Sequence, residues 1–568
     1  MKAVIIGGVA AGATAAARIR RLDEQAEIII VERGPYVSFA NCGLPYHISG
    51  AIEKRSKLLV QTPEGFMSRY RVEVLLNTEA IALDRAHKLI TAATKTADGS
   101  KNQQLSYDVL ILAQGGSPVF PLIEGIDAPH VYRLWTIPDM DRIIRHIKER
   151  APKSAAIIGG GFIGLETAEA FTERGLMVSI VEATDHVMPQ LDLVYGRKIE
   201  EQFREKGAQV FTNAVVKNIT DRAVILEDGT EILADLVLVS AGVRPNTELA
   251  QHAGLEVGKT GALLVDDYLR TSDSWIWAAG DMLEITSQVS HEKIRIPLAG
   301  PANRQGRIAA TNAVLAYYQE KPMPEAVRML RPMKYKGALG TSVIKIFDTT
   351  TASTGFSYAQ AKRAGLNVQE VTLVKGDHAS YYPGAEDLLV TLVYETASSS
   401  IIGAEAFGRK GVEKRIDAVA VALSAGLTVH DLAEIDFAYA PPYSSANDPL
   451  NMAAFMAENA LSGYSPVLGM YEAGNNAGMT KEDAVWLDVR NYGEYAKGHL
   501  ADSIHIPVDE LRDRLEEIPK NKPVYCISRG GFEGHLAVRT LMHYGYATVA
   551  NVSGGWTALH YAPGLETA

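Results

Sequence analysis

Two glycine turns, each set between an apolar stretch and a helix-forming stretch, constrain the fold of this chain most. In the first, the apolar residues 3–6 lead into the turn 7–12, an alanine-rich helical stretch follows, and a second apolar stretch ends at Glu32. Glu32 lies 20 residues after Gly12. This order predicts a Rossmann-like unit, in which the pyrophosphate of a dinucleotide lies on the helix N-terminus and the carboxylate binds a ribose hydroxyl. Val9 replaces the middle glycine of that fingerprint.

The same pattern returns complete in the second unit. Residues 155–158 lead into a turn with Gly159, Gly161 and Gly164, and a second apolar stretch ends at Glu182. Two such units predict two dinucleotides, and the economical pair is a bound flavin, FAD, with an exchanging nicotinamide. A carboxylate at the position of Glu182 accepts hydrogen bonds from the 2'-hydroxyl of NAD and repels a 2'-phosphate, so NADH is favoured over NADPH.

The bulk composition sets limits on partners and compartment. A chain of 568 residues is too long for one core, so several domains are expected. A net charge of -11 gives no reason to expect nucleic acid or an anionic membrane as partner. We expect neither a membrane-spanning segment nor a signal region, and the two cysteines favour a reducing cytoplasm. We expect no metal site.

The two cysteines lie far apart, each in a distinctive stretch. Cys42 lies within residues 38–46, and Cys526 opens the turn 526–531 after an expected strand at 523–525. Neither has a neighbouring cysteine, which excludes a Cys-x-x-Cys pair and predicts that each acts as a lone thiolate. The alternative is that both are small, buried hydrophobic residues.

Several of these stretches resemble stretches of known protein families. Residues 1 to about 455 resemble the pyridine nucleotide-disulfide oxidoreductases, and residues 38–46 resemble their single-cysteine branch, which includes coenzyme A disulfide reductases, NADH peroxidases and NADH oxidases. About the last 90 residues resemble a rhodanese domain through 487–490, 498–500, 506–507 and the cysteine turn. The whole chain is similar to coenzyme A disulfide reductase-rhodanese fusions, also described as NADH-dependent persulfide reductases.

The resemblance implies an α/β fold class with four domains and a homodimer. We expect an FAD-binding domain of Rossmann type at 1–115 and 246–324, with an NAD-binding domain of the same type at 116–245. An α+β interface or dimerisation domain is expected at 325–457. Residues 458–475, rich in Gly, Ser and Pro, are expected to form a linker before a rhodanese-like α/β domain at 476–568.

The resemblance also implies roles for individual residues. The residues expected to bind FAD and nicotinamide are Gly7, Gly12, Glu32, Arg33, Ala113, Asp281, Gly159, Gly161, Gly164 and Glu182. Those expected to bind coenzyme A are Thr14, Arg18, Arg21, Ser38 and Asn41. For Arg18 and Arg21 the alternative is a solvated helix face. The expected catalytic residues are Cys42 and Cys526, with Tyr381 or Tyr382, and Tyr439, acting from a partner subunit; core packing is the alternative for the tyrosines.

The rhodanese-like turn departs from the family pattern. Such turns usually run from the cysteine to an arginine five residues on, and their backbone N–H groups surround an anionic persulfide. When the following helix is matched through Ala537, Arg539 and Leu541, the turn is about two residues longer and Glu533 stands where the arginine would be. Arg529 is the candidate replacement. An acid at position 533 disfavours dianionic sulfur donors.

The leading hypothesis is an FAD-dependent, NADH-linked reductase of coenzyme A persulfide, polysulfide or coenzyme A disulfide. Cys42 would form a mixed disulfide with its substrate, and Cys526 would carry sulfane sulfur. One alternative is an NADH peroxidase or oxidase in which Cys42 becomes a sulfenic acid. Another is a reductase whose C-terminal domain is a docking module that does not transfer sulfur, which Glu533 favours.

Overall fold

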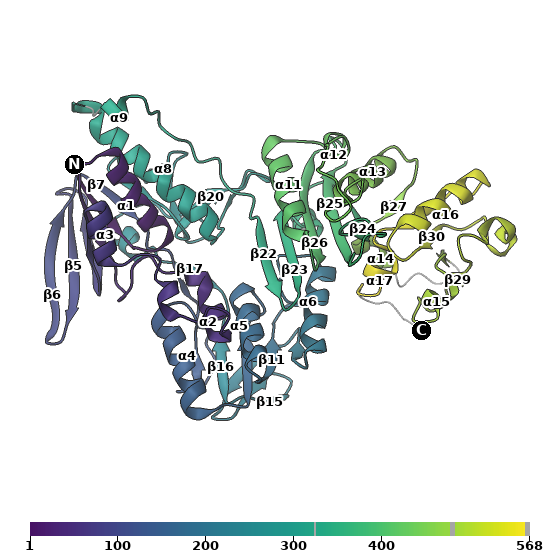
Figure 1. Ribbon diagram of the computed structural model, residues 1–568, viewed down its shortest axis with the longest axis horizontal. Helices are drawn as coiled ribbons and strands as arrows, with labels where there is room; N and C mark the ends of the chain where they lie inside the picture. The colour runs from purple at the N-terminus through teal and green to yellow at the C-terminus, as the bar shows by residue number, and fades with distance from the viewer. Residues whose placement is uncertain (323–324, 477–482, 563–568) are drawn as a thin grey trace. The chain divides into compact units, whose positions relative to one another are not determined.

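The computed structural model describes residues 1–322, 325–476 and 483–562, which belong to two compact units (Figure 1). One unit contains Met1–Ala183 and Ala214–Ala338, and the other contains Thr184–Asn213 and Leu339–Ala568. Residue 324, where we expected the FAD-binding domain to end, lies outside the described residues, as do 477–482 and 563–568 of the expected rhodanese-like domain. Within the described ranges, no helix is both long and apolar enough to cross a bilayer.

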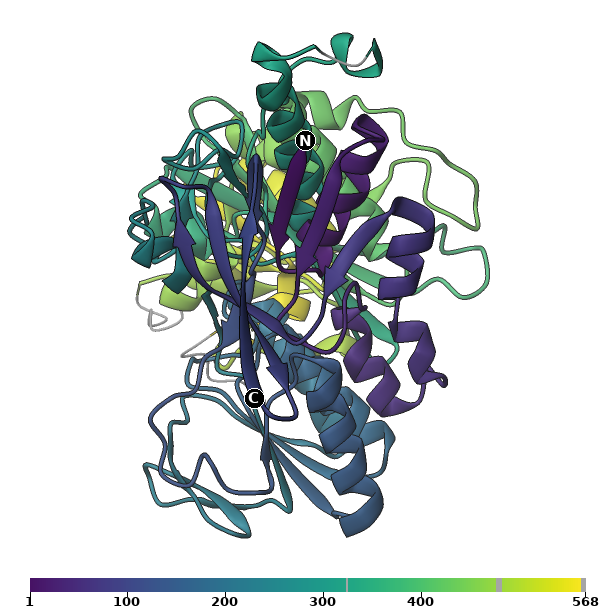
Figure 2. The ribbon, with the colours of Figure 1, turned by 90° about the vertical axis from the view of Figure 1, so that its left-hand side faces the viewer.

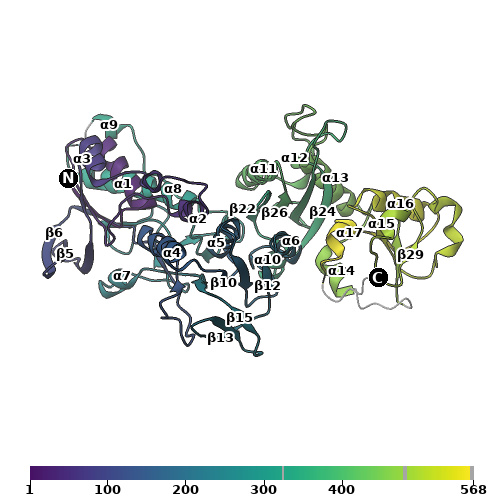
Figure 3. The same cartoon turned by 60° about the horizontal axis from the view of Figure 1, so that its bottom comes forward.

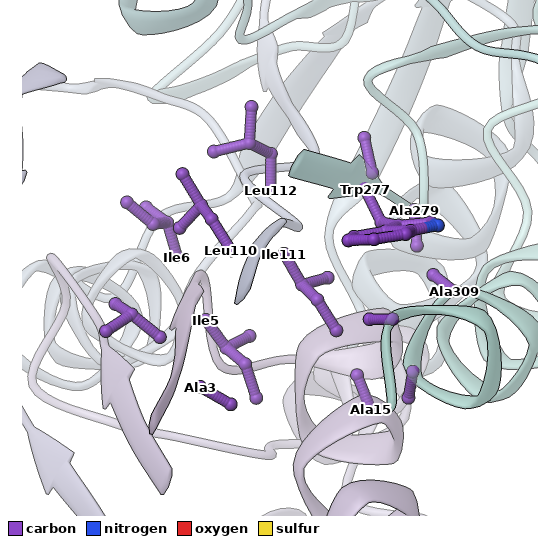
Figure 4. Packing of buried hydrophobic residues seen from close by; sticks show 14 of the residues in the cluster. Ala3, Ile5, Ile6, Ala15, Leu110, Ile111, Leu112, Trp277, Ala279 and Ala309 are labelled. Atoms are coloured by element: carbon purple, nitrogen blue, oxygen red, sulfur yellow. The ribbon is translucent and has the colours of Figure 1, made fainter. Parts of the chain in front are cut away.

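The first unit contains a five-stranded parallel sheet. Its strands, in order, are β19 (Ile276–Ala278), β7 (Val109–Leu112), β1 (Lys2–Ile6), β2 (Glu27–Val31) and β3 (Val72–Leu75). The central strands are continuous apolar runs, as parallel strands buried on both faces require, and Figure 4 shows Ile5, Ile111 and Trp277 in their core. Because β19 pairs with β7, the chain after residue 246 returns to the sheet formed by its first 115 residues, which supports the discontinuous FAD-binding domain.

Helix α1 (Ala10–Leu22) packs against α8 (Ala299–Tyr317), a helix from much later in the chain. Figure 4 shows Ala15 of α1 and Ala309 of α8 among the buried side chains of this core. A Cβ atom at Gly306 would lie 2.2 Å from the carbonyl oxygen of Ala11, so glycine is needed for this close approach. An antiparallel sheet of β4 (Thr78–Asp84), β5 (Leu89–Thr96) and β6 (Gly99–Ser106) also belongs to this unit (Figure 2).

A second parallel sheet in the same unit contains β11 (Met177–Val181), β10 (Ser154–Ile158), β16 (Leu236–Val239) and β9 (Val131–Tyr132), in that order. Helix α5 (Phe162–Glu173) follows the second glycine turn. Helix α4 (Ile137–Arg150) begins with a capping box formed by Thr136 and Asp139, which satisfies backbone N–H groups at its start. The prediction of two Rossmann-like units is therefore confirmed.

The second unit contains an antiparallel sheet ordered β22 (Ser342–Ile346), β23 (Thr349–Gly355), β26 (Ile401–Gly408), β25 (Asp387–Glu395) and β24 (Val368–Gly376). Helices α11 (Val412–Ala425), α12 (Val429–Ala433) and α13 (Pro449–Leu461) supply apolar residues to its core. Strand β24 is an edge strand of this sheet, so one row of its backbone N–H and C=O groups is left for other partners.

The last sheet of this unit is parallel and ordered β27 (Val467–Leu468), β31 (Val549–Val552), β30 (Val524–Ile527), β28 (Val485–Asp488) and β29 (Ile504–His505). Helix α16 (Phe532–His543) connects β30 to β31, and α17 (Gly555–Leu559) follows β31 (Figure 3). This arrangement confirms the predicted C-terminal α/β domain.

Part of the expected linker 458–475 is instead ordered structure of this domain. Its residues Val467 and Leu468 form β27, which pairs with Asn551 and Val552, and α14 (Met470–Asn476) follows. The Gly, Ser and Pro residues of the segment predicted a linker because they are typical of turns. Pairing with a strand about 80 residues later in the chain overrides that local preference.

Candidate active site

The first glycine turn brings the expected flavin-binding residues to the carboxyl edge of the first sheet. Gly7 has φ +96°, and a Cβ atom on Gly12 would lie 1.8 Å from the Gly7 carbonyl oxygen, so the turn is too tight for side chains at either position. The Glu32 carboxylate accepts hydrogen bonds from the N–H groups of Gly8 and Gly34, both at 2.8 Å. These bonds fix the carboxylate beside the turn, where a ribose would lie.

Other residues near this edge also fit a bound dinucleotide. Ala113 follows β7, and Asp281 follows β19 on the neighbouring strand. Burial raises the pKa of Asp281 to about 6. The Oε1 atom of Gln114 is buried and has no hydrogen-bond partner among the described residues, as expected where a ligand supplies the donor. Arg33 donates a hydrogen bond to the hydroxyl of Ser117 at 3.1 Å.

The second glycine turn repeats this geometry. Gly159 has φ +108°, and a Cβ atom on Gly164 would lie 2.0 Å from the Gly159 carbonyl oxygen. A Cβ atom on Gly161 would meet nothing within 4 Å, so protein packing does not explain this glycine; a ligand lying close to the backbone would. The N–H of Gly160 donates to the Glu182 carboxylate at 2.7 Å, which places that acid beside the turn.

Cys42 lies in a short helical turn, η1 (Asn41–Gly43), and its side chain reaches solvent. Nearby protein atoms still remove part of its hydration. This desolvation, followed by the charges of Glu166 and Asp281, raises the pKa of the Cys42 thiol. The protein's own groups therefore favour the neutral thiol, and activation of Cys42 depends on what binds beside it.

Glu166 is a site residue that the sequence analysis did not identify. It lies in α5, two residues after Gly164, and burial raises the pKa of its carboxyl group to about 7. The hydroxyl of Tyr46, four residues after Cys42, donates to its carboxylate at 3.3 Å. The helix that follows the second glycine turn is thereby connected to the segment that holds Cys42. The only signal in the sequence was an acid directly after a glycine turn.

The expected coenzyme A residues lie on α1 and on the Cys42 segment, within one unit. Thr14 donates a hydrogen bond to the side chain of Asn303 at 2.6 Å, and the Arg18 Nε donates to Thr311 at 3.0 Å. Ser38 has a left-handed backbone with φ +46°, and its N–H donates to the carbonyl of Gly8 at 2.8 Å. Asn41 begins η1. The structure thus connects the Cys42 segment to the first glycine turn.

Three guanidinium groups gather at the α1–α8 contact. Burial, followed by the positive charges of Arg307 and Arg21, lowers the pKa of Arg18. In the part of the chain that the structure describes, none of the three arginines forms a salt bridge with a carboxylate. Cations that repel each other without acidic partners are suited to binding a polyanion such as a phosphate group. Arg307 could not be found from local sequence because it lies about 290 residues after Arg18.

The structure brings Tyr381 and Tyr439 together in the second unit. Their hydroxyl groups lie 2.9 Å apart, and this hydrogen bond raises the pKa of Tyr381. Relative exposures of 73% and 47% exclude the alternative that they are core residues. Tyr382 instead packs edge-on against the ring of His378, with ring centroids 5.7 Å apart. Of the two neighbouring tyrosines, Tyr381 is therefore the one paired with Tyr439.

Cys526 is placed differently from the expected opening of a turn. It lies inside β30, is fully buried, and belongs to the apolar core of its domain. Burial raises the pKa of its thiol. The strand runs to Ile527, two residues beyond its expected end, so Ser528 is the first residue of the turn.

Comparison with known families matches three consecutive parts of the chain. Residues 1–306 match the model of the pyridine nucleotide-disulphide oxidoreductases, and residues 341–449 match the dimerisation domain of the same enzymes. Residues 475–562 match the rhodanese-like domain.

Curated relatives match about four-fifths of the chain. A protein from Methanocaldococcus jannaschii called NADH oxidase is 32% identical and covers 81% of this chain and 100% of its own length. The coenzyme A disulfide reductase of Staphylococcus aureus strain JH9 is also 32% identical, over 80% of this chain and 100% of its own.

Solved structures match nearly the whole chain. The reduced Bacillus anthracis protein CoADR-RHD has a TM-score of 0.92 and 40% identity, covering 99% of this chain and 98% of its own. An NAD-dependent persulfide reductase from A. fulgidus has a TM-score of 0.89 and 37% identity, covering 98% and 99%.

Proposed function

Because the chain belongs to the pyridine nucleotide-disulphide oxidoreductase family, we propose that it is an FAD-dependent, NADH-linked reductase of coenzyme A persulfide, polysulfide or coenzyme A disulfide. The observation that carries the proposal is the combination of a lone, solvent-reachable Cys42 with the arginine cluster of α1 and α8 in the same unit. A single cysteine cannot close an internal disulfide, so its partner sulfur belongs to the substrate.

The protein's residues divide the work of this reaction. Arg18, Arg21 and Arg307 bind the phosphate groups of coenzyme A, which leaves its flexible arm free to deliver the reactive sulfur to Cys42. With coenzyme A persulfide, Cys42 attacks the coenzyme A-bound sulfur, forms a mixed disulfide and releases hydrosulfide. Two electrons and a proton then split the mixed disulfide into the Cys42 thiolate and the coenzyme A thiol. FAD, when bound, would supply the transfer of these two electrons from NADH to sulfur.

The glycine turns supply the two dinucleotide sites. The first turn and Glu32 hold FAD, with Ala113, Asp281 and Arg33 at the same edge of the sheet. The second turn and Glu182 hold NADH. Glu182 disfavours a 2'-phosphate, so NADH is preferred over NADPH. The ratio of kcat/KM for the two cofactors tests this preference, and equal use of both would contradict it.

We further propose that the enzyme is a cytoplasmic homodimer in which Tyr381 and Tyr439 reach the Cys42 site of the partner subunit. The match to the dimerisation domain supports two copies, and the exposed tyrosine pair supports a role outside its own core. Its chemistry needs free thiols, which a reducing compartment preserves.

An NADH oxidase or peroxidase is the second candidate, and the relative called NADH oxidase supports it. In that reaction Cys42 would be oxidised to a sulfenic acid, and no phosphate-binding cluster would be required. Steady-state kinetics with coenzyme A persulfide, coenzyme A disulfide, peroxide and oxygen separate the two. The proposal predicts the highest kcat/KM for a coenzyme A substrate, and a higher value for peroxide or oxygen would contradict it.

A further inference from the structure

The position of Cys526 is that of a core residue. Strand β30 lies in the middle of its sheet, between β28 and β31. Cys526 packs among buried residues of β28 and α16, including Leu487, Ala537, Val538 and Leu541, and has no exposed surface. Burial raises the pKa of its thiol, and a thiol that stays protonated attacks sulfur poorly.

Ser528 occupies the position that the sulfur-carrying cysteine has in the family pattern. In the family pattern the cysteine stands five residues before the closing arginine, and five residues before Glu533 is Ser528. Ser528 is the first residue after β30 and accepts a hydrogen bond from the N–H of Gly531 at 2.8 Å. The N–H that would stabilise a sulfur anion is therefore bonded to a hydroxyl group.

The turn is also covered by the edge strand β24 of the neighbouring domain in the same unit. The N–H of Val374 donates to the carbonyl of Gly530 at 3.1 Å. Thr372 donates its N–H to the hydroxyl of Ser553 at 2.5 Å and accepts the N–H of Gly554 at 2.7 Å. The backbone N–H and C=O groups on the outer side of β24 are thus hydrogen-bonded to the turn 528–531 and to the loop that follows β31.

Side chains on both sides of these bonds extend the contact. Glu370, two residues before Thr372 on β24, is buried and accepts the N–H of Tyr471 at 3.3 Å. Arg529 forms a salt bridge with Asp387 of β25 at 2.7 Å. The β24 residues in this contact are Glu370, Thr372 and Val374, which alternate along the strand and all bond to the C-terminal domain.

We propose that the rhodanese-like turn 528–531 is an internal docking site for strand β24, and that the C-terminal domain covers this sheet edge instead of carrying sulfane sulfur on Cys526. The inference rests on the proposed reductase function only in assigning all sulfur reduction to Cys42. A covered edge strand cannot pair with other chains, which is the benefit that such capping provides.

Chemical mapping of the wild-type protein tests the cysteine directly. The FAD-loaded enzyme is incubated with inorganic polysulfide, alkylated without denaturant, digested and examined by mass spectrometry. We expect persulfide and alkylation at Cys42, and neither of them at Cys526. A persulfide on Cys526 in the folded enzyme would overturn the proposal. This readout remains decisive even if the enzyme proves to be an oxidase.

Kinetics of Cys526→Ala provide the second test. Turnover of polysulfide, coenzyme A persulfide and coenzyme A disulfide should each stay within about twofold of wild type, because removing one core sulfur leaves the Cys42 site intact. Selective loss of polysulfide turnover would show that Cys526 handles sulfur and would overturn the proposal. If the variant fails to fold, the wild-type mapping decides.

The docking contact is tested with Gly530→Ala. The added Cβ atom would lie 2.7 Å from the Cβ of Val374, so the contact must open. Gly493→Ala is the matched control, because its Cβ atom would meet only the Asn491 side chain at 3.4 Å. Amide hydrogen exchange at Val374 and Gly554 should become at least about tenfold faster in Gly530→Ala and stay unchanged in the control. Unchanged exchange in both variants would contradict the docking role.

Discussion

The two cysteines of this chain occupy opposite structural settings. Cys42 lies in a short helical turn, reaches solvent, and shares a unit with three arginines and two glycine turns. Cys526 lies inside a central strand among aliphatic side chains. In both settings the thiol pKa is raised, but at Cys42 desolvation is joined by the charges of Glu166 and Asp281, whereas burial alone acts at Cys526. A ligand bound beside Cys42 can offset the charges that act on its thiol. No ligand can reach the thiol of Cys526, which is fully buried.

The difference shows that a cysteine's function depends on its position relative to the end of its strand. Residues after the end of a parallel strand reach the ligand-binding edge of the sheet, whereas residues within the strand fill the core. A shift of two positions, from Ser528 to Cys526, moves the thiol from the turn into the core.

Cys42→Ser should have the largest effect. Turnover of coenzyme A persulfide and coenzyme A disulfide should fall by on the order of 10³-fold or more, the scale of removing a nucleophile. Stopped-flow absorbance should still show reduction of bound FAD by NADH, since neither glycine turn needs the thiol. Persulfide reduction at the wild-type rate would break the contrast between the cysteines.

Arg21→Gln should raise KM for coenzyme A substrates about 10- to 100-fold, corresponding to about 1.5–3 kcal/mol for a hydrogen bond to a charged group. Arg69→Gln, which changes an exposed arginine on α3 (Pro63–Tyr70), is the control and should leave KM unchanged. Steady-state kinetics with a small organic persulfide that lacks phosphate should show no difference between the variants. An equal rise in KM with that phosphate-free substrate would contradict a phosphate-binding role for Arg21.

Ser553→Ala should weaken the docking of the C-terminal domain by about 1–3 kcal/mol, because the buried N–H of Thr372 loses its acceptor. The change in docking free energy is measured from the urea midpoint at which the C-terminal domain unfolds, with hydrogen exchange as the probe. Ser398→Ala, at an exposed turn, should shift no midpoint. Activity with coenzyme A persulfide should persist, and its loss would argue that docking serves catalysis.

Glu166→Gln should produce the smallest change, an increased alkylation rate of Cys42. The charge of Glu166 raises the thiol pKa, and Glu166 itself is charged mainly above its own pKa of about 7. The variant should therefore exceed wild type most clearly above pH 7 and approach it at lower pH. Iodoacetamide rates across pH 6–9 measure the effect, with Glu173→Gln on the same helix as control. A rate increase that is independent of pH would contradict the charge argument.

Much of the fold follows from local sequence, because the two glycine turns impose a strand, a helix and an acid at fixed spacing. The active-site role of the segment around Cys42 is also predicted from local sequence. Arg307 was not, since only the packing of α8 on α1 brings it near Arg18. The local sequence predicts that the strand containing Cys526 ends at residue 525, although the apolar Ile527 continues it. The role of Val467 and Leu468 depended on a strand that lies much later in the chain.

The most direct test of the account is to trap the enzyme with its substrate. FAD-loaded protein is mixed with coenzyme A disulfide in the absence of NADH, quenched with acid, and each cysteine peptide is weighed by mass spectrometry. The account predicts a coenzyme A mixed disulfide on the peptide that contains Cys42 and an unmodified peptide containing Cys526. Coenzyme A attached to Cys526, or an unmodified Cys42, would contradict it.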